Sequence, residues 1–340
     1  MKAARFYEKG KLVVEDIPVV EPSDDEVLIN IKYCGICGTD VHIFNGDKGS
    51  SPVTPPVTLG HEFSGDVVKV GKNVRRFAVG DRVSVDPNSY CGECYFCQNG
   101  KKQMCDDMKG IGTALDGAFA EYITVPEKLV YKIADNVSYE AASMTEPLSC
   151  CLHGFDMTGV RLGDTVMVVG TGNIGLLMVQ LAKHAGATTI IAVEPNERRR
   201  NIAIELGAAF GIDPLHDDTD AFLKEHNIVN IDKVIDCAGR VSTNEYSVHY
   251  AGKGATVMLF GLTGPDDEMR LKPFEVFQKE LTIKGSFVNP DTFERAGRLL
   301  STGIISTDKI ITDIVPLSDI QEAFATRAYA KNGKMIIKCS

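Results

Sequence analysis

The chain has no surplus of basic residues, no long uninterrupted hydrophobic run and no low-complexity tract. Its net charge of −10 at pH 7 argues against nucleic-acid binding, because neutralising backbone phosphates requires a basic surface. The triplet Arg198-Arg199-Arg200 is too short to supply such a surface and is typical of the polar face of a helix. We therefore expect a small molecule, rather than nucleic acid, as the partner.

A segment able to cross a membrane is also lacking. The longest apolar stretch, residues 165–182, is interrupted by glycines and Asn173, so it predicts a buried strand, a turn and a helix. No apolar segment follows the basic residues near the start, so no signal peptide is expected, and we predict a cytoplasmic protein that does not bind membranes. The ten cysteines should then be reduced and available for metal binding rather than disulfides.

Two domains are expected, because 340 residues exceed the size of one ordinary hydrophobic core. The first third is β-rich: residues 27–33 and 67–70 are mostly apolar, and frequent glycines and prolines separate such short strands. After about residue 150, apolar runs alternate with helical patterns, which predicts a doubly wound parallel sheet. The expected strands there are 166–169, 190–193, 234–235, 256–260 and 281–284, and the expected helices are 174–185 and 196–206.

The segment that begins at Asp291 returns to a mixed pattern. It predicts a helix, a short strand near Ile311, a helix over 320–329 and a last strand over 335–338. No internal repeat is visible, and the predicted fold class is α/β with a β-rich second domain.

The segment Gly170-Thr171-Gly172-Asn173-Ile174-Gly175 matches the pattern G-x-G-x-x-G and lies between an expected strand and an expected helix. In that context the first glycine makes a turn, the second lets a pyrophosphate approach the backbone, and the third lets helix and strand pack closely. Glu194, at the end of the next strand, can bond the adenosine ribose hydroxyls and would repel a 2′-phosphate. We therefore expect NAD, while the nearby Arg198 to Arg200 keep NADP as the alternative.

Four cysteines with metal-ligand spacing occur within fifteen residues: Cys91, Cys94, Cys97 and Cys105. Thiolates at such short spacings can enclose one Zn²⁺ tetrahedrally and leave no coordination position open. A closed site of this kind is structural, so the sequence predicts a zinc ion that stabilises a lobe over about residues 88–108.

A second group of metal-binding residue types is dispersed along the chain. Cys37, His61 and a carboxylate form the borderline-soft mixture that suits Zn²⁺ and leaves a fourth position for water or substrate. Spacing alone does not establish this site, because Cys37 can equally be a small buried residue and His61 a hydrogen-bonded core histidine.

Four separated motifs occur in one order along the chain. They are Gly35-Ile36-Cys37-Gly38-Thr39-Asp40-x-His42, Gly60-His61-Glu62 with Gly65, Gly71 and Val74 after it, the four-cysteine lobe, and Glu146-Pro147-Leu148. With these motifs the chain resembles the zinc-dependent medium-chain dehydrogenases, above all the polyol (sorbitol-type) branch, over essentially its whole length. The resemblance implies a GroES-like catalytic domain over residues 1–148, a Rossmann domain over 149–287 and a C-terminal segment, 288–340, that completes the catalytic domain.

The resemblance implies two zinc ions per chain, one structural and one catalytic. Cys37 and His61 would bind the catalytic zinc, and Glu62 would be a ligand that can exchange with water. Glu146 stands where other alcohol dehydrogenases of the family have cysteine, and it would bind zinc directly or through a water molecule. The adjacent pair Cys150-Cys151 is the alternative source of the third ligand.

The resemblance also implies a proton relay from Thr39 through the nicotinamide ribose to His42, because histidine is a common general acid and base. Other contacts to the dinucleotide are implied at Ile174, Arg199, Phe260-Gly261-Leu262 and Ser286-Phe287.

The activity implied is reversible, zinc- and NAD-dependent oxidation of a secondary alcohol to a ketone. The Glu146-Pro147-Leu148 run favours a polyol such as sorbitol, xylitol or arabitol, or its phosphate. L-Threonine 3-dehydrogenase and 2,3-butanediol dehydrogenase are the alternatives, because threonine dehydrogenases share residues 35–42 almost identically. The segment 285–290 lacks the Phe-Arg-Tyr run of sorbitol dehydrogenases, which leaves the substrate open.

The same resemblance implies a homotetramer or dimer. A non-catalytic zinc and thiol redox sensor is the alternative from another functional class, because four clustered thiolates can be oxidised. That alternative leaves the glycine-rich segment, Cys37 and His61 unexplained.

Overall fold

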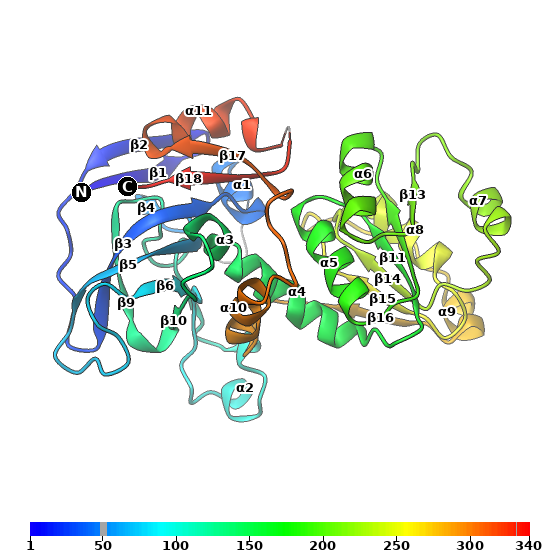
Figure 1. The fold of residues 1–340 in the computed structure, drawn as a ribbon, viewed down its shortest axis with the longest axis horizontal. Coiled ribbons are helices and arrows are strands. Elements are labelled where there is room, and N and C mark those ends of the chain that lie inside the picture. The colour runs from blue at the N-terminus through cyan, green and yellow to red at the C-terminus, as the bar shows by residue number, and fades with distance from the viewer. Residues whose placement is uncertain (48–52, 331) are drawn as a thin grey trace. The chain divides into compact units, whose positions relative to one another are not determined.

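The computed structural model describes residues 1–47, 53–330 and 332–340 (Figure 1). The chain divides into two compact units. Unit 1 comprises Met1–Ser149 and Asn289–Ser340, and unit 2 comprises Cys150–Val288. Unit 1 is therefore built from both ends of the chain.

The main feature of unit 1 is a seven-stranded sheet in the order β10-β6-β5-β3-β18-β17, with β9 paired to β3. The last strand of the chain enters this sheet antiparallel to β3, with Ile336 opposite Gly35. The strands are β3 (Glu26–Gly35), β5 (Glu62–Val70), β6 (Arg82–Val85), β9 (Tyr122–Pro126), β10 (Val130–Lys132), β17 (Ile311–Pro316) and β18 (Lys334–Lys338).

The core of unit 1 joins residues from both ends of the chain. The ring of Phe324 lies 5.1 Å from that of Phe44 and 6.2 Å from that of Phe119. A smaller sheet, in the order β2-β1-β4, contributes Ala3, Ala4 and other residues to the same core. The other strands of unit 1 are β1 (Lys2–Glu8), β2 (Lys11–Asp16), β4 (Val57–Thr58), β7 (Asn88–Ser89) and β8 (Lys109–Gly110). Its α-helices are α1 (Gly38–Phe44), α2 (Tyr95–Gln98), α3 (Tyr139–Ser143), α10 (Phe293–Ser301) and α11 (Ile320–Ala325). Helix α4 (Thr145–Thr158) begins in unit 1 and continues into unit 2.

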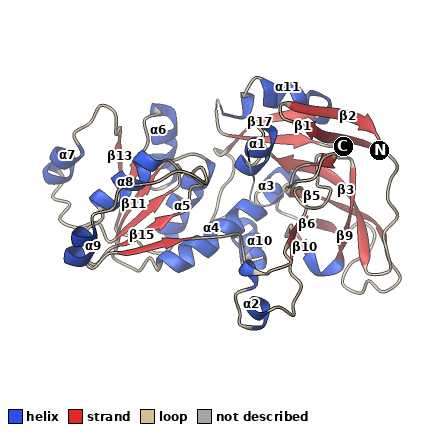
Figure 2. Ribbon diagram, turned by 180° about the vertical axis from the view of Figure 1, so that it is seen from behind, coloured by secondary structure: helices blue, strands red, loops and turns tan. Residues whose placement is uncertain are grey.

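Unit 2 contains a six-stranded parallel sheet in the order β13-β12-β11-β14-β15-β16, flanked by helices (Figure 2). Its central strands are buried along almost their whole length, as expected for a parallel sheet covered on both faces. The predicted doubly wound parallel sheet is thus confirmed. Its strands are β11 (Thr165–Val169), β12 (Thr189–Val193), β13 (Phe210–Ile212), β14 (Lys233–Asp236), β15 (Thr256–Leu259) and β16 (Thr282–Gly285), and its helices include α5 (Asn173–His184), α6 (Glu197–Leu206), α7 (Thr219–Glu225), α8 (Val241–Tyr250) and α9 (Pro273–Lys279).

Two local differences from the prediction concern short elements. Strand β13 is absent from the prediction because three residues are too few to give a recognisable apolar run. The helix expected over 320–329 ends at Ala325, because residues 325–327 are exposed and Arg327 adopts a φ of +53°, which interrupts a right-handed helix. Among the described residues, no helix is long and apolar enough to span a membrane.

Candidate active site

The cysteine lobe lies between β7 and β8 of unit 1. The four sulfurs of Cys91, Cys94, Cys97 and Cys105 lie within 4.8 Å of one another. The Sγ atoms of Cys91 and Cys97 are 3.9 Å apart, and those of Cys91 and Cys105 are 3.4 Å apart. Tetrahedral coordination at a Zn–S distance of about 2.3 Å requires S–S separations of roughly 3.8 Å. The donor set and its spacing therefore fit one structural Zn²⁺.

The electrostatics of the lobe also favour a metal ion. Hydrogen bonds from the backbone N–H groups of Cys97 and Asp106 lower the pKa of the Cys94 thiol to about 6. Desolvation and the neighbouring sulfurs raise the pKa of Cys97 to about 12. Four thiolates this close repel one another, so a cation is needed before all of them can ionise.

Replacing Cys97 with serine is expected to lower the zinc content by one ion per chain and to destabilise the protein by at least about 2 kcal/mol, because a structural metal site loses a ligand. Hydrogen exchange should increase in the lobe, while the folded fraction keeps its turnover number. Metal analysis and thermal unfolding measure both effects, and Cys94→Ser should reproduce them. Unchanged zinc content in both variants would contradict a four-sulfur site.

The second metal-binding group lies at one end of the strand pair β3 and β5. Their antiparallel pairing places Gly35 opposite Glu62. Cys37 follows β3 as the N-cap of α1, and His61 directly precedes β5. One ligand atom from each of Cys37, His61 and Glu62 consequently lies within 4.8 Å of the others. A thiol, an imidazole and a carboxylate in this arrangement fit Zn²⁺ and leave room for a further ligand.

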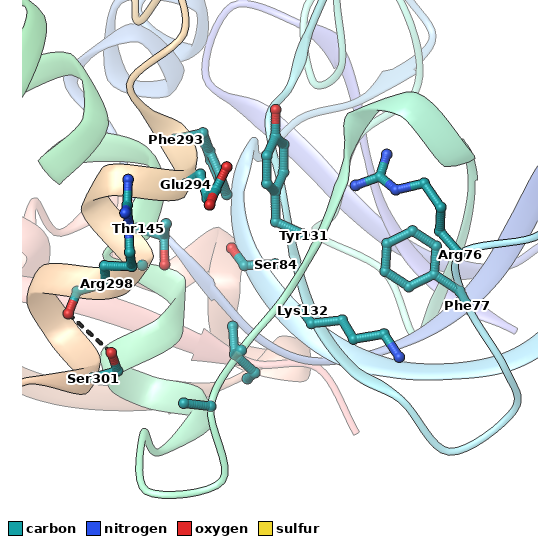
Figure 3. A pocket seen from close by; sticks show the side chains of 13 residues that line it. Arg76, Phe77, Ser84, Tyr131, Lys132, Thr145, Phe293, Glu294, Arg298 and Ser301 are labelled. Carbon is teal, nitrogen blue, oxygen red and sulfur yellow. Dashed lines mark hydrogen bonds between the residues drawn. The ribbon is translucent and has the colours of Figure 1, made fainter.

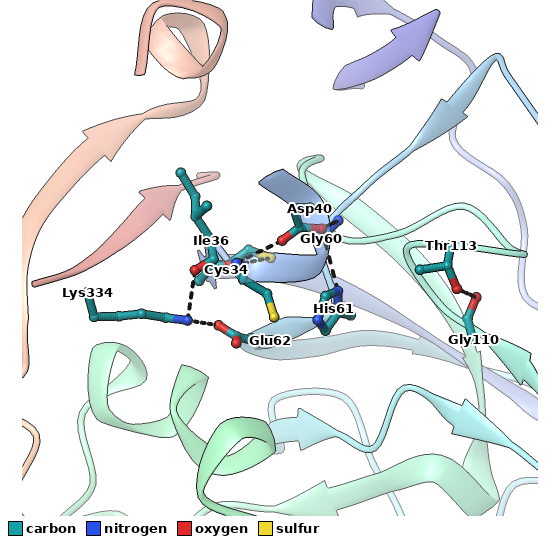
Figure 4. A network of polar contacts seen from close by, with 11 residues as sticks. Cys34, Ile36, Asp40, Gly60, His61, Glu62, Gly110, Thr113 and Lys334 are labelled. Carbon is teal, nitrogen blue, oxygen red and sulfur yellow. Dashed lines mark hydrogen bonds and ion pairs between the residues drawn. The ribbon is translucent and has the colours of Figure 1, made fainter. Parts of the chain in front are cut away.

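Asp40 is absent from the predicted site, yet it is fully buried and holds this group in place (Figure 4). Its carboxylate accepts hydrogen bonds from the backbone N–H groups of Cys37, at 2.9 Å, and Gly60, at 3.2 Å. The same carboxylate faces Nδ1 of His61 at 3.5 Å, the arrangement by which a carboxylate orients a metal-binding histidine. The signal in the sequence is an acid three residues after the helix N-cap, as in a capping box.

The charges around His61 favour a cation. Burial by itself lowers the pKa of this imidazole, but the charges of Asp40 and Cys37 outweigh burial and raise the pKa well above its usual value. A divalent metal ion would supply the positive charge that these groups stabilise and would displace the proton from His61.

Lys334 is the second residue of this group that the prediction lacks. Lys334 is 3% exposed, and its ammonium donates hydrogen bonds to the Glu62 carboxylate and, at 2.9 Å, to the backbone carbonyl of Ile36 (Figure 4). Burial opposes the charge on this amine, but Glu62, Cys37 and Glu146 together raise its pKa. A permanent positive charge therefore lies beside the metal-binding group. Lys334 reaches it only because β18 pairs with β3, which no local pattern indicates.

Glu146 is buried in the first turn of α4. Its charge acts on Lys334, but its carboxylate is not among the described ligand atoms that lie within 4.8 Å of one another. The described group likewise does not include Cys150 or Cys151. The structure thus brings together Cys37, His61 and Glu62, with Glu146 in electrostatic reach.

The two predicted relay residues lie on α1, which Cys37 caps. Thr39 and His42 are three positions apart, so their side chains share one face of the helix. The His42 side chain is 39% exposed, and its Nδ1 lies 3.5 Å from the carboxylate of Asp47. A proton that reaches His42 can therefore pass to solvent.

In unit 2 the glycine-rich segment connects β11 to α5. Gly170 has a φ of +83°, and a Cβ there would lie 2.8 Å from Ala238. A Cβ on Gly175 would lie 2.0 Å from the carbonyl oxygen of Gly170, whereas a Cβ on Gly172, the N-cap of α5, would contact nothing within 4 Å. The first and third glycines are thus required by packing, and the open space at the second is where a phosphate can approach the helix N-terminus.

Glu194 lies beside this segment, at the end of β12. Its Oε2 accepts a hydrogen bond from the backbone N–H of Thr171 at 2.9 Å, and its Oε1 accepts one from Asn196 at 3.0 Å. Arg200 donates to the backbone carbonyl of Glu194 at 2.5 Å and pairs with Asp213 at 3.5 Å. The carboxylate is therefore fixed at the edge of the sheet where a dinucleotide ribose is normally held.

Two buried hydroxyl oxygens of unit 2, Thr171 Oγ1 and Ser286 Oγ, have no hydrogen-bond partner within the described part of the chain. Thr171 lies in the glycine-rich segment and Ser286 follows β16, so both lie at the carboxyl edge of the parallel sheet. Buried unpaired hydroxyls at this edge fit a polar ligand such as a dinucleotide. The other predicted contacts are Asn173 and Ile174 in the first turn of α5, Arg199 in α6, Phe260-Gly261-Leu262 after β15, and Phe287 after β16.

Two family models match the chain: the alcohol dehydrogenase GroES-like domain over residues 23–135 and the zinc-binding dehydrogenase over residues 173–302. The first match contains both metal-binding groups, and the second begins inside the glycine-rich segment, at Asn173, and covers most of unit 2.

Similar proteins cover almost the entire chain. A D-arabitol-phosphate dehydrogenase of Enterococcus avium is 38% identical over 95% of this chain and 92% of its own length. An L-threonine 3-dehydrogenase of Caldanaerobacter subterraneus subsp. tengcongensis is 37% identical over 98% of this chain and 96% of its own length. A solved structure from Sinorhizobium meliloti 1021, named as a zinc-binding dehydrogenase and bound to NADP, has a TM-score of 0.95 and 39% identity over 99% of this chain and 98% of that chain.

Proposed function

This chain belongs to the zinc-dependent medium-chain alcohol and polyol dehydrogenases, oxidoreductases that act on alcohols, and we propose that it oxidises a secondary alcohol of a polyol or polyol phosphate with NAD⁺. The observation that carries the proposal is the group formed by half-buried Cys37 and buried His61 and Glu62, whose ligand atoms lie within 4.8 Å of one another. The polyol class is supported by Glu146 in place of a cysteine and by the similarity to an arabitol-phosphate dehydrogenase.

In the proposed reaction Cys37 and His61 hold the catalytic zinc, with Glu62 or Glu146 as the carboxylate ligand, and the four cysteines of the lobe hold the structural zinc. When bound, zinc acts as a Lewis acid on the alcohol hydroxyl, and NAD⁺ accepts the hydride from the carbinol carbon. Asp40 keeps the His61 ring oriented.

The hydroxyl proton of the alcohol must also leave the site. We propose that the Thr39 hydroxyl would receive this proton while it passes its own proton on, and that a bound dinucleotide would supply the ribose hydroxyl that connects Thr39 with His42. The exposed position of His42 then allows release to solvent. For each alcohol oxidised, one hydride is transferred and one proton is released.

The test is NADH formation by the zinc-loaded protein with sorbitol, xylitol, ribitol, arabitol and their phosphates, 2,3-butanediol and L-threonine, with Cys37→Ser as the blank. Zinc-dependent turnover of a polyol or a polyol phosphate supports the proposal and identifies the class. If only L-threonine or 2,3-butanediol is oxidised, the proposed reaction type stands and the proposed substrate class is wrong. Absence of NAD binding would refute the proposed cofactor.

Replacing Glu194 with glutamine is expected to shift the ratio of kcat/KM values for NADP and NAD toward NADP by about tenfold. The amide removes the negative charge that would repel a 2′-phosphate and weakens a charged hydrogen bond to the ribose. Steady-state kinetics with both dinucleotides measure the ratio. Glu197→Gln, an exposed acid in the next helix, is the matched control and should leave the ratio unchanged. If Glu194→Gln also leaves it unchanged, Glu194 does not select the cofactor.

We also propose that the enzyme is a homodimer or homotetramer. Phe274 and Phe277 of α9 are 70% and 77% exposed, and α9 leads into β16, an edge strand of the parallel sheet. Exposed aromatic side chains beside an open strand edge are typical of a protein interface. Sedimentation analysis should give a dimeric or tetrameric mass, and a monomer at micromolar concentration would contradict the proposal.

A further inference from the structure

Unit 1 contains a cavity of about 410 Å³ that shares no lining residue with the metal-binding groups (Figure 3). This volume lies within the range typical of small-molecule sites. The cavity is bordered by the loop after β5, by β10 and by one face of α10. Its lining includes three basic side chains, Arg76, Lys132 and Arg298, and three aromatic ones, Phe77, Tyr131 and Phe293.

The two guanidinium groups of this lining have no acidic partner among the residues that the structure describes. No hydrogen bond or ion pair joins the Arg298 side chain to another residue of the described structure, although Glu294 lies one helical turn away. Within residues 1–47, 53–330 and 332–340, the Arg76 side chain donates a hydrogen bond only to the backbone carbonyl of Val130, at 3.4 Å, and it lies over the ring of Phe77 at 5.3 Å. In a chain with a net charge of −10, such a pair is an isolated positive site.

The third cation is largely neutralised, because Lys132 forms an ion pair with Asp81 at 2.8 Å. Arg298 also borders a neighbouring cavity of about 310 Å³, which Arg295 lines as well. The exposed face of α10 therefore carries two arginines, Arg295 and Arg298, beside one acid, Glu294. Glu294 is the only acid in the lining of the larger cavity and leaves an excess of positive charge there.

The walls and floor of the cavity are uncharged, with aromatic rings and hydroxyl groups. The rings of Tyr131 and Phe293 pack at a centroid distance of 4.8 Å and form an apolar wall. The hydroxyls of Ser84 and Thr145 already donate to the backbone carbonyl of Ala142, at 3.2 and 2.7 Å. Anion recognition thus rests with the arginines at the rim, and the interior suits an uncharged organic body.

We propose that this cavity binds a small organic phosphate, of the size of a sugar phosphate. A guanidinium fork matches two oxygens of a phosphate, and Arg76 and Arg298, which lie on opposite sides of Tyr131 in Figure 3, provide two such forks without a carboxylate partner among the described residues. The Glu294 carboxylate can accept a hydrogen bond from a hydroxyl of the organic part. The proposal does not depend on which alcohol the enzyme oxidises.

The test is calorimetric titration of the zinc-loaded enzyme, saturated with NADH, with ribose 5-phosphate, ribose and inorganic phosphate. Saturation with NADH keeps the ligands out of the dinucleotide site. Arg298→Ala and Arg76→Ala should each weaken ribose 5-phosphate binding at least about tenfold, because each removes a charged hydrogen-bonding group. Arg161→Ala, an exposed arginine of unit 2, is the matched control and should bind normally.

Hydrogen exchange locates the bound ligand independently of the variants. Protection of residues 131–134 and 293–301 by ribose 5-phosphate, with no binding of ribose, supports the proposal. Circular dichroism checks that the variants fold, and Arg298→Lys, which keeps the charge without the fork, should bind with intermediate affinity. If inorganic phosphate binds with the same affinity as ribose 5-phosphate, the cavity is a simple anion site, and the proposed specificity for an organic phosphate is wrong. Binding that neither arginine variant weakens, or no binding at millimolar concentration, overturns the proposal.

Discussion

Replacing Cys37 with serine is expected to lower kcat/KM for alcohol oxidation by at least about a thousandfold while the fold persists. The variant loses the thiolate of the catalytic metal site, and a Lewis acid supplies several kcal/mol of transition-state stabilisation. About 1.4 kcal/mol corresponds to a factor of ten in rate. Stability should change little, because Cys37 is the N-cap of α1 and serine is a favoured residue at that position.

The comparison with Cys97→Ser makes this prediction specific. Cys37→Ser should keep the unfolding midpoint that the wild-type protein has without its catalytic zinc and should lose turnover, whereas Cys97→Ser should lose stability and keep the turnover of its folded fraction. Circular dichroism, metal analysis and NADH formation distinguish the two outcomes. Equal loss of folded structure in both variants would mean that the two metal sites do not have separate structural and catalytic roles.

The fold class was within reach of the sequence because its main signals are local. Central strands such as β11 and β12 are buried on both faces and therefore appear as continuous apolar runs. The helix that begins near Asn196 is bounded by a capping asparagine and by Gly207 at its end. The end of α11 was less predictable, because it depends on exposure and on the φ of one residue, Arg327.

The candidate site likewise contains residues that a local sequence pattern indicates and residues that only the strand pairing brings together. The lobe cysteines are close in sequence, so their spacing alone indicates a metal ion. Cys37 and His61 meet only through the pairing of β3 with β5, and the resemblance to a family was needed to join them. Lys334 lies almost three hundred residues from Glu62, and a lone lysine in a final strand normally indicates a solvated side chain. Its burial is a property of the sheet topology.

Replacing Lys334 with methionine is expected to destabilise the zinc-free protein by about 3–5 kcal/mol, because it leaves Glu62 buried without its counter-charge. The pKa of Lys334 is raised, so the charged pair is fully present at neutral pH and its contribution is lost only in strongly alkaline solution. Urea unfolding at neutral pH measures the effect. Lys338→Met, at the exposed end of the same strand, is the matched control and should change stability by less than about 0.5 kcal/mol.

Zinc should reduce the cost of Lys334→Met, since a divalent cation beside Glu62 replaces the lost positive charge. The variant should therefore gain more stability from zinc than the wild-type protein gains, and it should bind zinc more tightly because the ammonium no longer repels the metal. The double variant Lys334→Met/Glu62→Gln removes both charges and should recover much of the zinc-free stability. An equal cost with and without zinc would show that Lys334 serves only the fold, and that its charge does not influence the metal site.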